Sequence, residues 1–157
     1  MAAHEALVAA GATHAGLYAS GSLRIESGFR AFGHELTPGT TPFEAGLGAF
    51  AAFGTGFVGE DALKAHHPER RIVSILFDDP DAIPIHDEPI YFDGQVVGQI
   101  TSAAWSYRFG RSVALAMVRA PLDRLEGQEI VDGFEVEIAC ARFSAKASLK
   151  PAKEAFA

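Results

Sequence analysis

The stretch Pro89-Ile90-Tyr91-Phe92-Asp93-Gly94-Gln95-Val96-Val97-Gly98-Gln99-Ile100-Thr101 decides the fold, because it has the pattern of two short strands joined by a tight turn. Asp-Gly between runs of apolar and aromatic residues is the strongest short-range signal of a β-hairpin, since both turn positions need positive φ angles. We therefore expect antiparallel strands over residues 89–92 and 95–101. This hairpin marks the second half of the chain as β structure.

The same alternation of apolar and polar residues continues on both sides of the hairpin. β-branched and aromatic side chains recur in further short runs, at residues 71–77, 112–118, 129–131, 134–139 and 142–149. About six short antiparallel strands in this part of the chain favour a small barrel or a sandwich, because closure leaves no unpaired strand edge.

The residues before position 66 follow a helical pattern instead. We expect a short helix over residues 5–10, closed by Gly11, and a longer helix over residues 14–29, whose end is bracketed by Gly28 and Gly33. Residues 43–53 are a candidate strand interrupted by glycines. Spacings of seven, four and three predict that one face of the longer helix and the turn after it carries Tyr18, Ile25, Phe29 and Phe32.

A break between the two patterns falls at His66-His67-Pro68-Glu69-Arg70, where a proline and charged or titratable side chains interrupt the apolar runs. We therefore divide the chain into residues 1–68 and residues 69–157. A length of 157 residues suits one domain, or one small domain with part of another.

The composition restricts the classes of partner and the compartment. Hydrophobic residues are 48% of the chain and charged residues 21%, as in ordinary globular proteins. The net charge of -7 argues against nucleic acid and against an anionic membrane as partners, because both bind basic surfaces. The single cysteine, Cys140, cannot form an internal disulfide, and no apolar run reaches the roughly 18 residues that span a bilayer. We expect a cytoplasmic protein.

Four motifs follow one another along the chain. They are Leu23-Arg24-Ile25-Glu26 with its continuation through Gly33-His34-Glu35-Leu36 to Thr41-Pro42-Phe43-Glu44-Ala45-Gly46-Leu47, then residues 57–63, 93–102 and 112–118. In this order they resemble the glycine cleavage T-protein (aminomethyltransferase) family, and in particular the folate-binding C-terminal portion of dimethylglycine and sarcosine dehydrogenases. The resemblance implies an α+β fold, in which a partial α/β folate-binding domain precedes a small antiparallel Greek-key β-barrel. It also implies a place in one-carbon metabolism.

The resemblance further implies that Arg24 binds tetrahydrofolate, because Arg24 matches the arginine of the family's Leu-Arg-Leu-Glu motif. A guanidinium suits folate, which presents a hydrogen-bonding pterin edge and glutamyl carboxylates to a rigid fork of five donors. The alternative is an ion pair of Arg24 with Glu26 or Glu35, of the solvated kind that contributes little to stability.

Tyr18, Glu44 and Trp105 are further candidates for the folate site. Tyr18 and Glu44 lie in the part of the chain that the resemblance covers, and Trp105 follows Thr101-Ser102 of the third motif. The alternatives for them are a core ring with a bonded hydroxyl, a turn contact and a partly exposed strand residue, respectively. The family's tyrosine after the last strand, which closes over folate, has no counterpart in residues 150–157, where Phe156 offers a ring without a hydroxyl.

The catalytic aspartate of the family and a pterin-binding glutamate lie in an amino-terminal half without a counterpart here, so we assign no catalytic residue. The FAD of the dehydrogenase relatives would also bind a domain outside this chain, since no Gly-x-Gly-x-x-Gly follows a strand. We therefore expect a truncated unit, inactive alone, that associates with a companion chain carrying the missing half or with itself. The apolar side chains such a cut would expose are Leu7, Val8, Leu17, Leu47 and Phe50.

Other schemes match the sequence less well. His86-Asp87-Glu88 has no second histidine downstream to complete a metal site, no Gly-x-Ser-x-Gly is present, and Cys140 resembles a small buried hydrophobe. A non-catalytic, folate-linked binding or assembly module stays open as a second interpretation, because function does not follow from fold alone.

Overall fold

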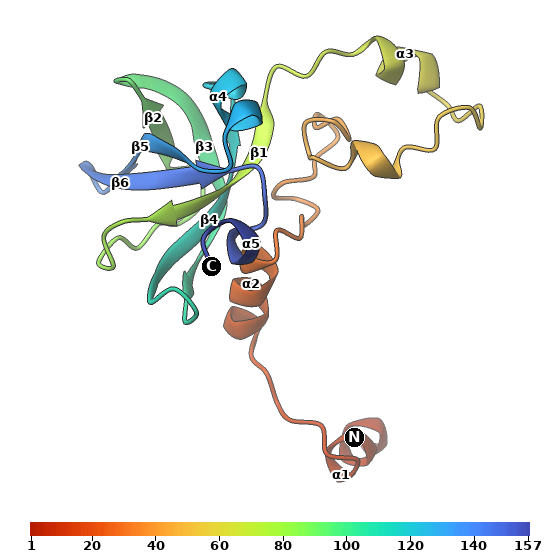
Figure 1. The fold of residues 1–157 in the computed structure, drawn as a ribbon. Coiled ribbons are helices and arrows are strands. Elements are labelled where there is room, and N and C mark those ends of the chain that lie inside the picture. The colour runs from red at the N-terminus through yellow and green to blue at the C-terminus, as the bar shows by residue number, and fades with distance from the viewer.

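A closed barrel of six antiparallel strands forms the main body of the computed structural model, which describes residues 1–157 (Figure 1). Around the barrel the strand order is β1-β4-β3-β2-β5-β6, and β6 pairs with β1 to close it. Strands β2, β3 and β4 are neighbours joined by consecutive hairpins, and β1 lies beside β4 instead of β2. This is a Greek-key arrangement. The expected α+β fold with a small Greek-key barrel is confirmed. The strands are β1 (Arg71–Phe77), β2 (Pro89–Phe92), β3 (Gln95–Ser106), β4 (Arg111–Val118), β5 (Val131–Ile138) and β6 (Ala141–Ser148).

The hairpin predicted from Asp93-Gly94 joins β2 to β3, and both turn residues have positive φ angles of 49° and 77°. Two strands differ from the prediction. Strand β3 continues to Ser106, beyond its β-branched residues, because β4 supplies hydrogen-bonding partners along its whole length. The two runs predicted at 129–131 and 134–139 form the single strand β5, with a register shift between Val131 and Phe134.

Alternation along the strands separates two apolar clusters. Odd-numbered residues of β1 point into the barrel, where Ile75 and Phe77 pack with Phe134 and other fully buried side chains. Ile72, on the opposite face of β1, packs outside the barrel against Leu115 of β4. The barrel therefore has a filled interior and a second apolar surface on β1 and β4.

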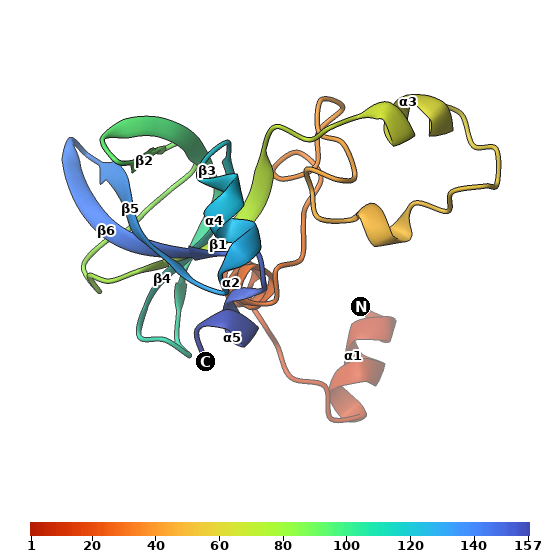
Figure 2. The ribbon, with the colours of Figure 1, turned by 45° about the horizontal axis from the view of Figure 1, so that its top comes forward.

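Helix α2 (Leu17–Glu26) covers this second surface together with the short helix α5 (Ala152–Ala155), as Figures 1 and 2 show. Ile25 of α2 and Ala152 of α5 are buried there against Ile72, Val113 and Leu115. Burial of Ile25 therefore fixes α2, and with it Arg24, on the outside of the barrel.

The remaining short helices lie around this body. Helix α1 (Ala2–Ala9) stands apart from the barrel, and α3 (Glu60–Ala65) lies on a long excursion of the chain that precedes β1 (Figure 2). Helix α4 (Leu122–Gly127) connects β4 to β5. None of the helices is long and apolar enough to cross a membrane.

The predicted apolar face of the helix over residues 14–29 is wrong for three of its four residues. The helix ends at Glu26, and Gly28 follows in a left-handed conformation with a φ of 66°, so the helical spacing does not continue. Of the four residues only Ile25 is buried, whereas the exposed fractions of Tyr18, Phe29 and Phe32 are 97%, 67% and 81%. The side of α2 that meets the barrel is partly polar, with Ser22 and Glu26 beside Ile25.

Two more predictions are corrected. Residues 43–53 form turns and a 3-10 helix (Gly48–Phe50) in place of a strand, because Gly46 adopts a positive φ that breaks extended structure. Cys140 is exposed and has a φ of 65°, since it belongs to the turn between β5 and β6. The predicted exposure holds for Leu7, Val8, Leu17 and Phe50, while Leu47 is half-buried.

Candidate functional site

A buried carboxylate, Glu35, joins the loop after α2 to the barrel. Glu35 is 1% exposed. Its Oε1 accepts hydrogen bonds from the hydroxyls of Thr101 at 2.8 Å and Ser102 at 2.6 Å, while its Oε2 accepts from Nη1 of Arg24 and from the backbone N–H of Ala31, both at 2.9 Å. One side chain therefore connects the helix, the loop and strand β3.

A β-bulge brings the two hydroxyls to the same carboxylate oxygen. Ile100 pairs with Ala116 and Ser102 with the neighbouring Leu115, so Thr101 is the extra residue of β3. In a regular strand, adjacent side chains point to opposite faces, and a bulge redirects one of them. The Thr-Ser motif can therefore place both hydroxyls on the outer face of the barrel, toward Glu35.

The surroundings of Glu35 favour its ionised form. Burial alone raises the pKa of this carboxyl. The hydrogen bonds from Ser102, Ala31 and Thr101, together with the positive charge of Arg24, outweigh burial, so the pKa of Glu35 lies below its ordinary value. Glu35 is consequently a carboxylate near neutral pH and neutralises part of the charge of Arg24.

Arg24 forms the ion pair with Glu35 that sequence analysis gave as an alternative, yet part of its guanidinium is free. Nη1 donates to Oε2 of Glu35 and to the backbone carbonyl of Phe29, at 2.9 and 2.8 Å. Nε and Nη2 make no hydrogen bond, and the side chain is 25% exposed. The two bonds fix the plane of the guanidinium and leave one edge of its fork for another partner. The ligand role of Arg24 stays a prediction.

Glu26, the other expected partner of Arg24, binds elsewhere. Its Oε1 accepts from the hydroxyl of Ser106 at 2.6 Å, and its Oε2 lies 3.4 Å from Nε of Arg108. Glu26 therefore attaches α2 to the end of β3.

The other three predicted site residues have separate surroundings. Glu44 makes the turn contact, because its Oε2 accepts from the backbone N–H and hydroxyl of Thr41 at 2.8 and 3.0 Å, while its Oε1 accepts from Nε of Arg70 at 2.7 Å. Burial raises the pKa of Glu44, but the bonds from Arg70 and Thr41 lower it below its ordinary value. Tyr18 is almost fully exposed rather than a core ring, and Trp105 is 40% exposed. No hydrogen bond or ion pair joins Arg24 to Tyr18, Glu44 or Trp105.

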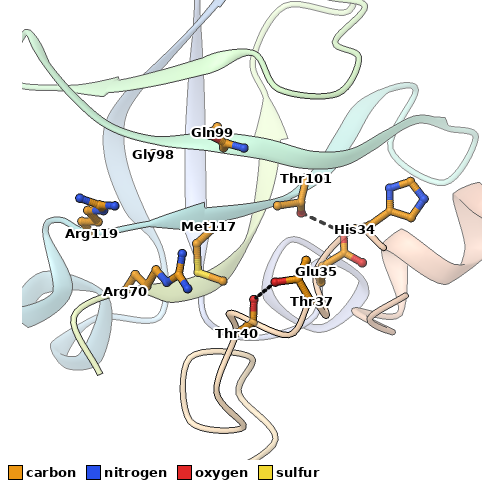
Figure 3. Close-up of a pocket in the computed structure, with 10 residues that line it drawn as sticks. All are labelled: His34, Glu35, Thr37, Thr40, Arg70, Gly98, Gln99, Thr101, Met117 and Arg119. Carbon is orange, nitrogen blue, oxygen red and sulfur yellow. Dashed lines mark hydrogen bonds between the residues drawn. The ribbon is translucent and has the colours of Figure 1, made fainter. Parts of the chain in front are cut away.

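Glu35 and Thr101 also line a pocket of about 280 Å³ between the loop at residues 34–40 and strands β3 and β4 (Figure 3). Its wall is polar, and Met117 is its one apolar side chain. Arg70 and Arg119 bring two guanidinium groups to the pocket.

Sequence reasoning did not find the central place of Glu35 or the pocket residues Arg70 and Arg119. Glu35 belongs to the first of the four motifs, and Thr101 and Ser102 belong to the third, but their contact depends on a β-bulge that has no local sequence signal. Arg70 belongs to the break between the two sequence patterns, and Arg119 follows the last residue of β4 without belonging to a motif.

Comparisons with known proteins cover nearly the whole chain. Residues 70–152 match the glycine cleavage T-protein C-terminal barrel domain, and residues 1–55 match the GCVT N-terminal domain. Human mitochondrial dimethylglycine dehydrogenase is 38% identical over 78% of this chain, and the mouse mitochondrial pyruvate dehydrogenase phosphatase regulatory subunit is 37% identical over 93% of it. The crystal structure of the glycine cleavage system aminomethyltransferase T from Bartonella henselae superposes on 94% of this chain, with a TM-score of 0.78 and 24% identity.

This chain spans only part of each relative. It matches 14% of the length of the dehydrogenase, 18% of the regulatory subunit and 41% of the crystallised aminomethyltransferase chain.

Proposed function

This chain belongs to the glycine cleavage T-protein family, and on that premise we propose that it is the folate-binding and barrel portion of a tetrahydrofolate-dependent aminomethyltransferase or N-methyl amine dehydrogenase. The expected resemblance to this family is confirmed by the matches over both parts of the chain. The relatives named for these activities are much longer than this chain, so we propose the reaction only for an assembly that also contains the missing parts.

The free edge of Arg24 carries this proposal. Its Nε and Nη2 donors are without partners, while Nη1 is held by Glu35 and by the carbonyl of Phe29. A planar fork held in this way can donate two parallel hydrogen bonds to a glutamyl carboxylate or to the pterin edge without losing its orienting contacts. Such a guanidinium suits tetrahydrofolate.

The aromatic side chains after α2 add to the fit. Phe29 and Phe32 are 67% and 81% exposed, on the segment whose backbone is bonded to Arg24 and Glu35. A pterin ring needs apolar faces as well as donors, and exposed rings supply such faces. Bound tetrahydrofolate would supply the acceptor for a one-carbon unit, whereas the residues of this chain would bind and orient it.

We propose that the catalytic groups lie outside these 157 residues, in an amino-terminal half of the kind that the longer relatives contain. Exposed apolar side chains on α1, α2 and the segment after them support an association, since isolated domains rarely leave so many uncovered. On this proposal the chain binds folate weakly and is inactive alone. Any FAD would be bound by a different domain.

Calorimetric titration with tetrahydrofolate, under reducing conditions, tests this function. The chain is titrated alone and with a polypeptide carrying the amino-terminal half of a relative. Loss of two charge-assisted hydrogen bonds in Arg24→Gln is expected to weaken binding at least tenfold. Arg142→Gln removes the same charge from β6 and is expected to bind as the unaltered chain does. Equal affinity of both variants would count against the folate site at Arg24.

A non-catalytic binding or assembly module is the second candidate. The 37% identity to a protein named as a regulatory subunit favours it, because that identity extends over 93% of this chain. Folate binding without one-carbon transfer, in the presence of the amino-terminal half, would select this candidate over the first.

A further inference from the structure

We propose that the pocket between the loop at residues 34–40, β3 and β4 is a binding site for a small oxyanion, a carboxylate or a phosphate, held by Arg119 and Arg70. Arg24 does not line this pocket, so binding there does not depend on folate binding at Arg24. The proposal is carried by the charge, the unused donors and the size of the pocket.

Arg119 lines the pocket with a guanidinium that has no partner within the chain. Its backbone N–H donates to the carbonyl of Val97 at 2.8 Å, which fixes the end of β4 against β3. Its guanidinium makes no hydrogen bond and no ion pair within the chain, although the chain as a whole carries a net charge of -7. A fixed backbone with a free guanidinium at the rim of a pocket is suited to bidentate contact with an anion.

Arg70 is held rigidly and still has a donor to offer. Its Nε donates to Glu44 at 2.7 Å and its Nη2 to the backbone carbonyl of Gly39, so two of its nitrogens are occupied. Nη1 makes no hydrogen bond. Because Glu44 lies outside the pocket lining, the carboxylate that orients Arg70 does not occupy the space that an anion would take.

The acidic group in the pocket wall does not repel an anion strongly. Glu35 is the single acidic residue of the lining, and its two oxygens already accept from four donors. Its charge is paired with that of Arg24 at 2.9 Å. The uncompensated charge in the lining is therefore that of Arg119.

The loop supplies hydroxyl donors to the same space. Oγ1 of Thr37 and Oγ1 of Thr40 lie 3.0 Å apart, so one hydroxyl proton bridges the two and the other stays available. In the view of Figure 3, Arg119 and Arg70 lie toward one end of the pocket, and the threonines lie along its lower side. Side chains with guanidinium and hydroxyl donors, from different elements, therefore line one pocket.

The volume limits the occupant to a small molecule. At about 280 Å³ the pocket lies at the lower limit of ordinary ligand sites, which begin near 300 Å³. Inorganic phosphate and short dicarboxylates fit this volume and share the oxyanion chemistry that two arginines recognise.

Calorimetric titration of the full 157-residue chain with inorganic phosphate, and separately with malonate, tests the proposal at constant ionic strength set by sodium chloride. We expect saturable binding of at least one of the two, and the preferred one identifies the source of the oxyanion. Arg119→Gln is expected to weaken that binding at least tenfold. Arg142→Gln, which removes an equal charge outside the lining, is the matched control and is expected to leave the affinity unchanged.

Since Arg119 is exposed and its side chain makes no hydrogen bond or ion pair, its replacement is not expected to unfold the chain, which far-ultraviolet circular dichroism checks. Thr40→Val gives a second readout, with a smaller loss of affinity from a hydroxyl donor on the loop. The proposal is overturned by two results: no saturable binding beyond that of chloride, or binding that both arginine variants retain equally.

Discussion

Replacement of Glu35 by glutamine is expected to destabilise the fold, because this carboxylate joins α2, the following loop and β3. Its two oxygens accept hydrogen bonds from Arg24, Ala31, Thr101 and Ser102. Glutamine has one acceptor oxygen and one amide group that donates. It therefore cannot accept from all four groups, and the ion pair with Arg24 is lost.

The magnitude follows from the number of donors affected. Thr101 keeps a second acceptor, the carbonyl of Leu115 at 2.9 Å, so its loss is small. The other donors lose a charged acceptor or have none, and each buried donor without an acceptor costs about 1–3 kcal/mol. We expect Glu35→Gln to lower the free energy of unfolding by about 2–4 kcal/mol.

Urea denaturation followed by circular dichroism measures this change, as a lower midpoint at an unchanged slope. Glu137→Gln is the matched control, because its ion pair with Arg142 at 3.7 Å is on the surface and contributes less than about 1 kcal/mol. The pKa of Glu35 is lowered in the folded state, so its stabilisation is fully present above the unfolded value of about 4.3 and is lost as the pH falls through the lower folded pKa. A loss below about 1 kcal/mol at pH 7, or a loss that does not shrink in acid, would mean that the network does not hold the fold together.

Three further changes test other parts of the structure. A Cβ on Gly98 would lie 2.1 Å from the carbonyl oxygen of Met117, so Gly98→Ala is expected to lower the free energy of unfolding by about 3 kcal/mol or more in urea denaturation. Gly127 has open space around it, so Gly127→Ala is expected to be nearly neutral. Equal effects of the two variants would exclude the predicted clash. Phe134 is fully buried in the barrel, so Phe134→Ala is expected to cost about 3–5 kcal/mol, and a loss below about 1 kcal/mol would contradict its place in the core. Burial raises the pKa of Glu88 despite a backbone hydrogen bond, so ionisation of Glu88 destabilises the fold as the pH rises through the folded pKa. Glu88→Gln is therefore expected to raise the melting temperature at pH 7 but not near pH 4. A variant no more stable than the unaltered chain at pH 7 would contradict this.

The barrel was largely predictable because its signals are local. Asp93-Gly94 and the period of two gave the bounds of β1 and β2 as the structure has them, and β4 and β6 to within one residue. Side-chain alternation and turn chemistry act over a few residues, so one sequence suffices to find them. The end of β3 escaped prediction, since it is set by pairing with β4 rather than by its own residues.

The helical part was less predictable, because its contacts join residues distant in sequence. The spacing that grouped Phe29 and Phe32 with Ile25 assumed a helix that Gly28 ends. The Glu35 network spans 66 positions to Thr101 and needs a bulge to align the hydroxyls. The motif points to Arg24, but the sequence does not distinguish Glu26 from Glu35 as the side chain that orients its guanidinium.

The most direct test of the folate site at Arg24 is to locate the residues that respond to tetrahydrofolate. Nitrogen-15 chemical shifts of the labelled chain, followed during titration with tetrahydrofolate up to millimolar concentration, report which residues meet the ligand. We predict weak, saturable changes concentrated at residues 22–36, around Arg24, and largely absent in Arg24→Gln. Saturable changes confined to β5 and β6, or none at any concentration, would contradict the assignment of the folate site to Arg24.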